Sequence, residues 1–257
     1  MAGNILFFDF DNTLYSHQTN CVPESARAAL GRLQAAGHTL VLATGRGQES
    51  LSMMERELGF LPETVILLNG QVIQQRGITV FERYIALPSM DSIIQTAKSR
   101  RLSYGGYCST GLLVNAYCER VKTVWREFGS PLPALHENFE EELALYHGHL
   151  YITEAEAALF APALEDYVTN WSHRYLVNLI PKAAGKSQAV LWCLSTMQAG
   201  ESYAFGDGYN DVDMIQAVDH GIAMGDGFAA LKEQAEYVTR TADEDGIAVA
   251  LTHYRLL

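Results

Sequence analysis

Short, unbroken apolar runs alternate along the chain with stretches in which apolar residues recur every three or four positions. In the first eighty residues this pattern predicts strands at 4–9, 39–43 and 65–68, with helices at 23–36 and 48–58 between them. Gly37 and Gly59 follow the two helices, where a glycine commonly ends a helix. Continuous apolar strands separated by amphipathic helices are typical of a parallel sheet covered on both faces.

The same pattern returns near the carboxyl end, with helices expected at 187–197 and 211–217 and strands at 202–205 and 221–224. The middle of the chain differs: it carries most of the tyrosines and an alanine-rich segment, 154–168, that predicts a helix. We therefore predict an α/β fold, with a doubly wound, mostly parallel sheet and an inserted α+β domain. The expected boundaries are 1–82 and 181–257 for the main domain and 83–180 for the insertion.

Composition narrows the classes of partner. The chain has 257 residues and a formal net charge of -12, which argues against nucleic acid or an anionic membrane as the main partner. Its first apolar run is too short for a signal peptide, and no stretch approaches the length of a membrane-spanning helix. The four cysteines are scattered without a CxxC spacing. We expect a reduced, cytoplasmic protein.

Polar clusters follow several of the predicted strands. They are Asp9/Asp11/Thr13, Thr44-Gly45-Arg46, Asn69-Gly70 and the segment 206–211, which reads Gly-Asp-Gly-Tyr-Asn-Asp. Any one cluster alone is more often a turn than a site, because Asp, Asn and Gly favour turns. The carboxyl ends of parallel strands meet at one edge of a sheet, where ligands bind, so the four clusters together predict a single site.

Asp9 and Asp11 stand two positions apart after a strand, so their side chains should leave it on the same side. Two neighbouring carboxylates repel each other and need a divalent cation, a shared proton or a basic neighbour. The pair therefore predicts a metal-assisted active site. Because Asp9 lies so near, we expect the pKa of Asp11 to be raised.

These motifs, in this order, resemble those of the haloacid dehalogenase superfamily, and most closely its Cof-type sugar-phosphatase branch. The resemblance rests on Asp9-Phe10-Asp11-Asn12-Thr13-Leu14, Ala43-Thr44-Gly45-Arg46, Lys186 and the segment 206–211. The length of chain between Arg46 and Lys186 is ample for an inserted cap domain, and the resemblance implies that this cap has the C2B form. Three positions depart from the usual pattern of the branch: Asn12 replaces Gly, Ser187 replaces Gly, and Asp226 replaces Asn.

The resemblance implies a role for each motif. Asp9 would attack phosphorus and form an aspartyl-phosphate, while Asp11 would act first as acid and then as base. Mg²⁺ would be held by the carboxylates of Asp9 and Asp207 and by the main-chain carbonyl of Asp11, an all-oxygen set. Asp211 would hold metal-bound water or Lys186.

The remaining motif residues are expected to bind the phosphoryl group. They are Thr44 with Gly45, Lys186 and Asn210. Because Ser187 replaces the usual glycine, Lys182 stays open as an alternative to Lys186. Arg46 either contacts substrate or forms a surface ion pair.

The function expected from the sequence is a Mg²⁺-dependent phosphatase for a small phosphorylated metabolite, such as a sugar phosphate or a phosphorylated cofactor or its precursor. One alternative is a phosphomutase or phosphotransferase, in which the aspartyl-phosphate passes to a hydroxyl group. The other is a non-catalytic sensor of a phosphate ligand. The inserted domain and the presence of Asp11 disfavour the sensor.

Two groups of residues in the insertion could each have a functional or a purely structural role. His147 and His149 alternate near an expected strand and could bind a metal on one face, but the pattern favours surface histidines because no third ligand is evident. Four aromatic residues could form a substrate-facing wall, although a local core is the better interpretation. They are Tyr104, Tyr107, Tyr117 and Trp125.

Overall fold

The computed structural model describes residues 3–85, 87–139, 145–182 and 184–257. The chain divides into two compact units, one formed by Met1–Glu82 and Gly185–Leu257 and the other by Arg83–Ala184. The first unit is thus built from both ends of the chain. The second is the insertion between them.

The first unit is organised around one eight-stranded sheet with the order β14-β13-β12-β1-β2-β3-β4-β5. The strands β14 to β3 in this order are parallel, and β4 and β5 add an antiparallel hairpin at one edge. The strands are β1 Ile5–Phe8, β2 Thr39–Ala43, β3 Thr64–Leu67, β4 Val72–Gln75, β5 Ile78–Glu82, β12 Ser202–Gly206, β13 His220–Ala223 and β14 Tyr237–Val238.

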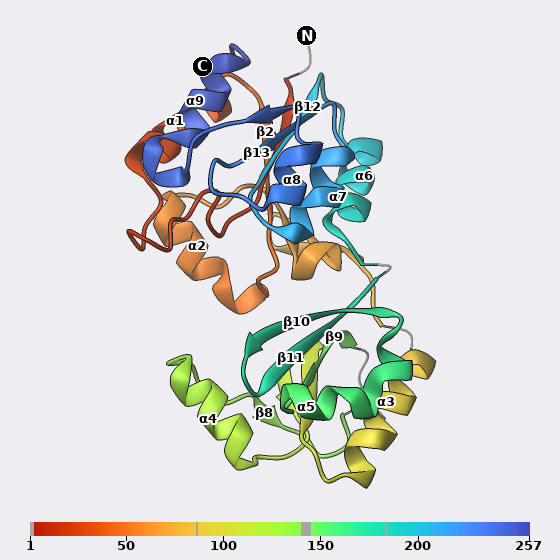
Figure 1. Cartoon of the computed structure of the whole chain (residues 1–257). Helices are drawn as coiled ribbons and strands as arrows, with labels where there is room; N and C mark the ends of the chain where they lie inside the picture. Colours follow the sequence, from red (N-terminus) through yellow and green to blue (C-terminus); the bar gives the residue numbers. More distant parts are fainter. Residues whose placement is uncertain (1–2, 86, 140–144, 183) are drawn as a thin grey trace. The chain divides into compact units, whose positions relative to one another are not determined.

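Helices cover both faces of this sheet (Figure 1), with α1 and α9 on one side and α6, α7 and α8 on the other. Because both faces are covered, β1 is fully buried along its length and reads as an unbroken apolar run. The helices are α1 Glu24–Ala35, α2 Leu51–Leu58, α6 Lys186–Thr196, α7 Val212–Gln216, α8 Ala229–Gln234 and α9 Gly246–His253.

The second unit has a six-stranded sheet with the order β10-β11-β9-β6-β7-β8. All neighbouring strands are antiparallel except β7 and β8. Its strands are β6 Tyr104–Cys108, β7 Gly111–Val114, β8 Ala134–Leu135, β9 Leu145–Leu150, β10 Tyr167–His173 and β11 Leu176–Pro181. Its helices are α3 Leu87–Ser99, α4 Glu119–Glu127 and α5 Glu154–Ala157.

Most of the predicted elements are present, and the fold class is confirmed. The helix expected at 154–168 is wrong in its extent, because α5 ends at Ala157 and a 3₁₀ segment with Pro162 inside it continues to Leu164. Proline lacks the N–H that a continuous α-helix requires. Within the described residues, no helix is long and apolar enough to cross a membrane.

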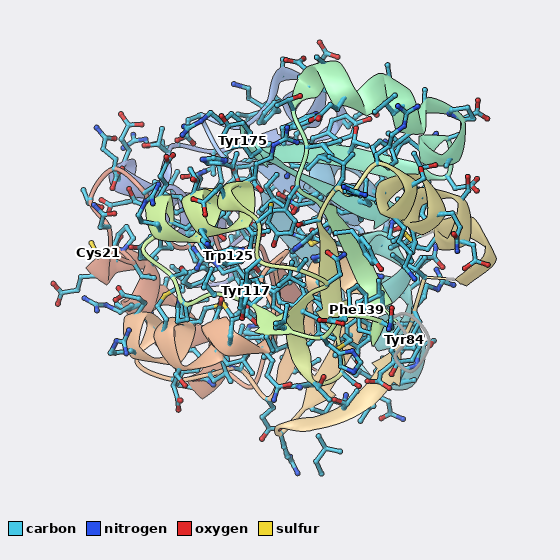
Figure 2. All side chains as sticks on the ribbon, turned by 90° about the horizontal axis from the view of Figure 1, so that it is seen from below. Cys21, Tyr84, Tyr117, Trp125, Phe139 and Tyr175 are labelled. Carbon is cyan, nitrogen blue, oxygen red and sulfur yellow. The ribbon has the colours of Figure 1, made fainter. Side chains whose placement is uncertain are left out.

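Three of the four aromatic residues named in the insertion have different surroundings, and the fourth, Tyr107, is described below with the histidines that it contacts. Tyr104 is buried in the core of the second unit. Trp125 packs beside a second, smaller apolar cluster and donates a hydrogen bond to the Tyr151 hydroxyl at 3.0 Å. Tyr117 is partly exposed and donates to the Pro133 carbonyl (both Tyr117 and Trp125 are labelled in Figure 2). For Tyr104 and Trp125 a packing role is therefore sufficient.

Candidate active site

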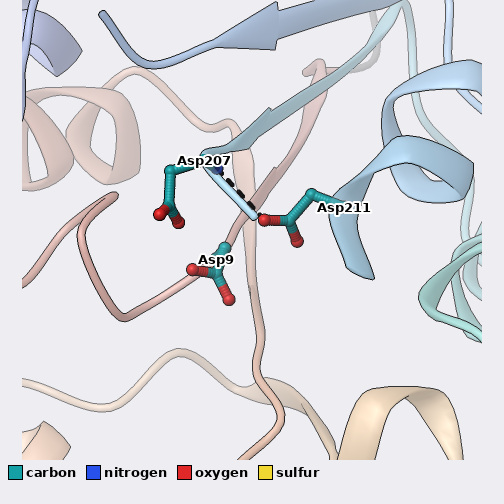
Figure 3. A group of neighbouring side chains, drawn as sticks. All are labelled: Asp9, Asp207 and Asp211. Atoms are coloured by element: carbon teal, nitrogen blue, oxygen red, sulfur yellow. Dashed lines mark hydrogen bonds between the residues drawn. The ribbon is translucent and has the colours of Figure 1, made fainter. Parts of the chain in front are cut away.

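Three carboxylates from two distant parts of the chain meet at the edge of the first sheet where β1 and β12 end. They belong to Asp9, Asp207 and Asp211, and one ligand oxygen from each lies within 4.8 Å of the others (Figure 3). Asp9 follows β1, and Asp207 and Asp211 follow β12. They meet because these two neighbouring parallel strands end at the same edge. Within the described residues, this is the one group of three or more such ligands.

Lys186 supplies the positive charge that this cluster contains. Its ammonium group is fully buried and donates to Asp9 Oδ1 at 2.5 Å and to Asp211 Oδ1 at 2.6 Å. Lys186 is the first residue of α6, and the preceding Gly185 lies against Gly70, in the loop after β3. A Cβ added at Gly70 would stand 2.3 Å from the Gly185 carbonyl oxygen, so glycine permits the close approach that positions Lys186.

The electrostatics of the cluster follow from burial and crowding. Burial raises the pKa of Asp9 well above its ordinary value, and Asp211 and Asp207 add to this effect while Lys186 opposes it. Burial, followed by the charge of Asp211, raises the pKa of Asp207 to about 6. One ammonium therefore leaves the three carboxylates undercompensated. A divalent cation fits this arrangement, because the donors are hard carboxylate oxygens and the local charge is negative.

Asp211 also shapes the loop that carries Asp207. Its Oδ2 accepts hydrogen bonds from the main-chain N–H groups of Asp207 at 3.1 Å and Gly208 at 2.9 Å, while its Oδ1 accepts from Lys186. Both oxygens are thus in use within the protein. The carboxylate links the loop geometry to the position of the lysine.

Asp11 has different partners from those expected. Arg46 donates to both of its oxygens, from Nε at 2.8 Å and from Nη2 at 2.6 Å, and His17 Nε2 lies 2.8 Å from Oδ1. Burial raises the pKa of Asp11, but Arg46 and His17 outweigh it, and the net shift is downward. The expectation of a raised pKa is therefore wrong for this conformation, because the basic neighbours outweigh burial.

Thr44 and Asn210 are linked through Asn69. The fully buried Thr44 accepts a hydrogen bond from the Arg46 N–H through its hydroxyl, and its carbonyl accepts from the Asn69 N–H at 3.0 Å. Asn210 donates to Asn69 Oδ1 at 2.9 Å. A Cβ at Gly45 would lie 3.1 Å from that same Asn69 oxygen, so Gly45 leaves room for the amide.

Most of the chain matches one family model. The model describes haloacid dehalogenase-like hydrolases, and it matches residues 6–251, which reach into both segments of the first unit. The chain belongs to this family of hydrolases. The expectations of the family and of an enzyme are therefore confirmed.

Relatives of this hydrolase share both its length and its fold. YkrA of Bacillus subtilis (strain 168), whose name places it among the phosphatases, is 28% identical over 262 residues and covers 100% of both chains. The 5-amino-6-(5-phospho-D-ribitylamino)uracil phosphatase YwtE of the same strain is 23% identical over 93% of this chain and 94% of its own. The crystal structure of a hypothetical protein from Geobacillus kaustophilus HTA426 has a TM-score of 0.90, with 22% identity and 100% coverage of both chains.

Two of the three departures of this hydrolase from the usual pattern, Asn12 and Ser187, have local explanations. Asn12 has a φ of 54°, a left-handed conformation that asparagine tolerates better than most residues. Ser187 lies in the first turn of α6, where its N–H and hydroxyl both donate to Asp213 Oδ2, at 3.2 and 2.7 Å. Lys182 belongs to the second unit, whereas Lys186 contacts Asp9 directly.

Two residues near the site were not predicted from the sequence: His17, which contacts Asp11, and Asp213, which holds the start of α6. Asn69 was expected near the site, as part of the cluster Asn69-Gly70, but its role in connecting Thr44 with Asn210 was not. His17 and Asp213 had no signal in the sequence, because their contacts depend on how a loop and a short helix fold back.

Proposed function

We propose that this hydrolase is a Mg²⁺-dependent phosphatase that cleaves small phosphomonoesters through an aspartyl-phosphate on Asp9. The observation that supports it best is the buried cluster of Asp9, Asp207 and Asp211 around Lys186. A carboxylate held against an ammonium group and two other carboxylates is suited to meet a phosphoryl group only when further positive charge is present. That requirement agrees with a metal-dependent reaction.

In this proposal, Mg²⁺ is held by the carboxylates of Asp9 and Asp207 and by the main-chain carbonyl of Asp11. When bound, it neutralises negative charge on the phosphoryl oxygens. The crowding of Asp9, Asp207 and Asp211 supports the choice, because a cation would relieve the repulsion among these carboxylates.

The nucleophilic attack and the proton transfers are assigned to side chains of the protein. Asp11 must first give up part of its contact with Arg46 and His17, which lower its pKa, and take up a proton. An Asp9 oxygen then attacks phosphorus, the bond to the alkoxide breaks, and Asp11 gives the alkoxide this proton. In the second step Asp11 takes a proton from the water that attacks the aspartyl-phosphate, the bond between phosphorus and the Asp9 oxygen breaks, and phosphate is released.

Lys186 is proposed to stay next to Asp9 and contact a phosphoryl oxygen, together with Thr44, Gly45 and Asn210. Its buried ammonium is the nearest fixed positive charge to the nucleophile. The amide of Asn210 is already held by Asn69, which limits the orientations it can adopt. A fixed donor costs little reorganisation when the transferring group arrives.

For the substrate we propose a phosphorylated sugar, polyol or cofactor precursor. We further propose that the second unit is the cap domain and that it recognises the organic part of the substrate. The name of YwtE, a phosphatase for a phosphorylated ribityl compound, supports this class. The test is a screen of the purified protein with Mg²⁺ against phosphorylated metabolites, with inorganic phosphate and the product isomer both measured. Phosphate release would support hydrolysis, whereas an isomerised phosphoester without free phosphate would show a phosphomutase.

A further inference from the structure

A pair of histidines in the second unit has no part in the proposed reaction. His147 and His149 belong to β9, which has β11 on one side and β6 on the other in its sheet. Residues two apart on a strand point to the same face, and the two imidazole rings do so here, with their centroids 5.3 Å apart and a tilt of 34°.

The surroundings of the pair are aromatic and closely packed. Tyr107 lies opposite His147 on β6, and its ring meets the two imidazoles edge to face, with centroid distances of 4.8 Å and 5.6 Å. Gly105 lies opposite His149 on the same strand and has no side chain. Of the two β6 residues opposite the histidines, only Tyr107 therefore places a side chain against the imidazole rings.

Neither histidine is a surface residue, so the interpretation favoured by the sequence is wrong. His147 is 6% exposed and His149 is 3% exposed. The Nδ1 atom of each ring is buried and has no hydrogen-bond partner in the protein. Buried polar atoms without a partner are rare and costly, so two of them on adjacent rings require an explanation.

The protonation state of the two histidines limits which partner their Nδ1 atoms can bind. Burial lowers the pKa of His147 to about 4, and burial with the charge of His147 lowers the pKa of His149 well below its ordinary value. Both rings are therefore neutral near pH 7, and a neutral imidazole has one nitrogen lone pair that can bind a metal.

The spacing of the rings also agrees with one shared metal ion. With a zinc–nitrogen bond of about 2.0 Å, the ion lies about 3.2 Å from each ring centre, and tetrahedral geometry then separates the centres by about 5.2 Å. The observed separation is 5.3 Å. A water molecule donating or accepting at a hydrogen-bond length of about 2.8 Å would place the centres about 6.5 Å apart in the same geometry.

We propose that His147 and His149 form a second metal site, which binds a late first-row divalent cation of the zinc type through the two Nδ1 atoms. Imidazole nitrogen suits such ions, whereas Mg²⁺ prefers the oxygen ligands of the Asp9 cluster. Within the described residues, no third His, Cys, Asp or Glu joins the pair, so water or a small anion completes the shell. The site is independent of the proposed phosphatase reaction.

The experiment measures bound metal in the full-length protein. Protein stripped with chelator is equilibrated with Zn²⁺ in a large excess of Mg²⁺, which occupies the carboxylate cluster, and bound zinc is then counted by elemental analysis. We expect about one zinc per chain, and at least about a tenfold weaker affinity in His147→Gln and in His149→Gln. His253→Gln removes an exposed histidine of α9 and is expected to bind zinc like the unaltered protein.

A second measurement keeps the proposal testable if a variant does not fold. Co²⁺ replaces zinc in the unaltered protein, and its visible absorption distinguishes tetrahedral ligation that includes imidazole nitrogen from six-coordinate oxygen ligation. A tetrahedral spectrum supports the site. The proposal is overturned if only the oxygen-type spectrum develops, if no zinc binds beside Mg²⁺, or if folded His147→Gln and His149→Gln bind zinc unchanged.

Discussion

At the scale of single residues, the site is a small group of charges that do not balance. Lys186 is enclosed by Asp9 and Asp211, and burial alone would lower its pKa, yet the two carboxylates raise it above the ordinary lysine value. Its charge is therefore retained near neutral pH. The lysine both stabilises the folded site and keeps Asp9 from being isolated among like charges.

We expect Lys186→Met to lose activity by about 100-fold or more, because a fixed positive charge beside the nucleophile is removed. The same change leaves two buried carboxylates without their partner, which costs on the order of 3–5 kcal/mol of stability. Phosphate release and chemical denaturation measure the two effects. Lys182→Met is the matched control, and equal losses in the two variants would contradict the assignment of Lys186.

The state of Asp11 is also testable. Arg46→Gln removes the bidentate partner that outweighs burial, so the pKa of Asp11 should rise. Carboxyl NMR titration of the metal-free protein would show this directly. An Asp11 pKa unchanged by the substitution would mean that Arg46 does not hold the carboxylate in solution.

The sequence predicted which residue types gather here, but not which of them touch. Asp9, Asp207 and Lys186 could be foreseen, because strand ends converge and the motifs resemble those of a known family. The contact of Arg46 and His17 with Asp11 could not be foreseen, because it depends on the path of the loop after β1. That contact reversed the expected direction of the Asp11 pKa.

At the scale of elements, the loop after β3 and the start of α6 fix each other. Gly70 has a φ of 92° and lies directly against the Gly185 carbonyl. Gly70→Ala should therefore destabilise the protein by about 1–3 kcal/mol and lower kcat, because Lys186 begins the helix that would be displaced. Thermal unfolding and phosphate release measure these effects.

Gly31→Ala is the control for that substitution. Gly31 lies within α1, and an added Cβ there would meet nothing within 4 Å. Alanine in a helix interior is favoured over glycine by about 1 kcal/mol, so this variant should be slightly more stable and fully active. A Gly70→Ala protein as stable and active as Gly31→Ala would contradict the proposed role of the loop.

The burial of His147 on β9 predicts that the stability of the protein depends on pH. The folded-state pKa of His147 is about 4, so below its ordinary value of 6.5 the unfolded chain binds a proton that the folded one does not. Stability is then complete above pH 6.5 and falls toward pH 4, by about 2 kcal/mol at pH 5 from this residue alone. His147→Gln should remove that part of the loss, as urea denaturation at pH 7.5 and 5 with chelator present would show. An identical pH dependence in both proteins would contradict the burial of a neutral ring.

The elements with regular patterns were the ones that the sequence could predict. β1 and β2 are buried on both faces, so their apolar runs were unambiguous. The hairpin of β4 and β5 was missed, because its strands alternate less clearly and β5 is largely exposed. The predicted helix at 154–168 failed because composition alone did not account for Pro162 or for the strand that begins at Tyr167.

At the scale of the whole molecule, we propose that the first unit carries out the reaction and that the second recognises the substrate. The first unit holds the charged cluster, and the second, Arg83–Ala184, contains the features that the family motifs do not cover. The insertion could be predicted, because a length of chain without core patterns separates Arg46 from Lys186. Its substrate preference could not be predicted, because residues that recognise an organic group need no fixed spacing.

The central claim is that Asp9 is the nucleophile of a Mg²⁺-dependent phosphatase. The most direct test is the rate of phosphate release from an aryl phosphate by Asp9→Asn, compared with Asp226→Asn, which makes the same chemical change outside the carboxylate cluster. We predict that Asp9→Asn folds but loses at least about 1,000-fold in rate, while Asp226→Asn stays near the unaltered rate. A folded Asp9→Asn protein that hydrolyses the ester at the rate of the Asp226→Asn control would contradict the mechanism.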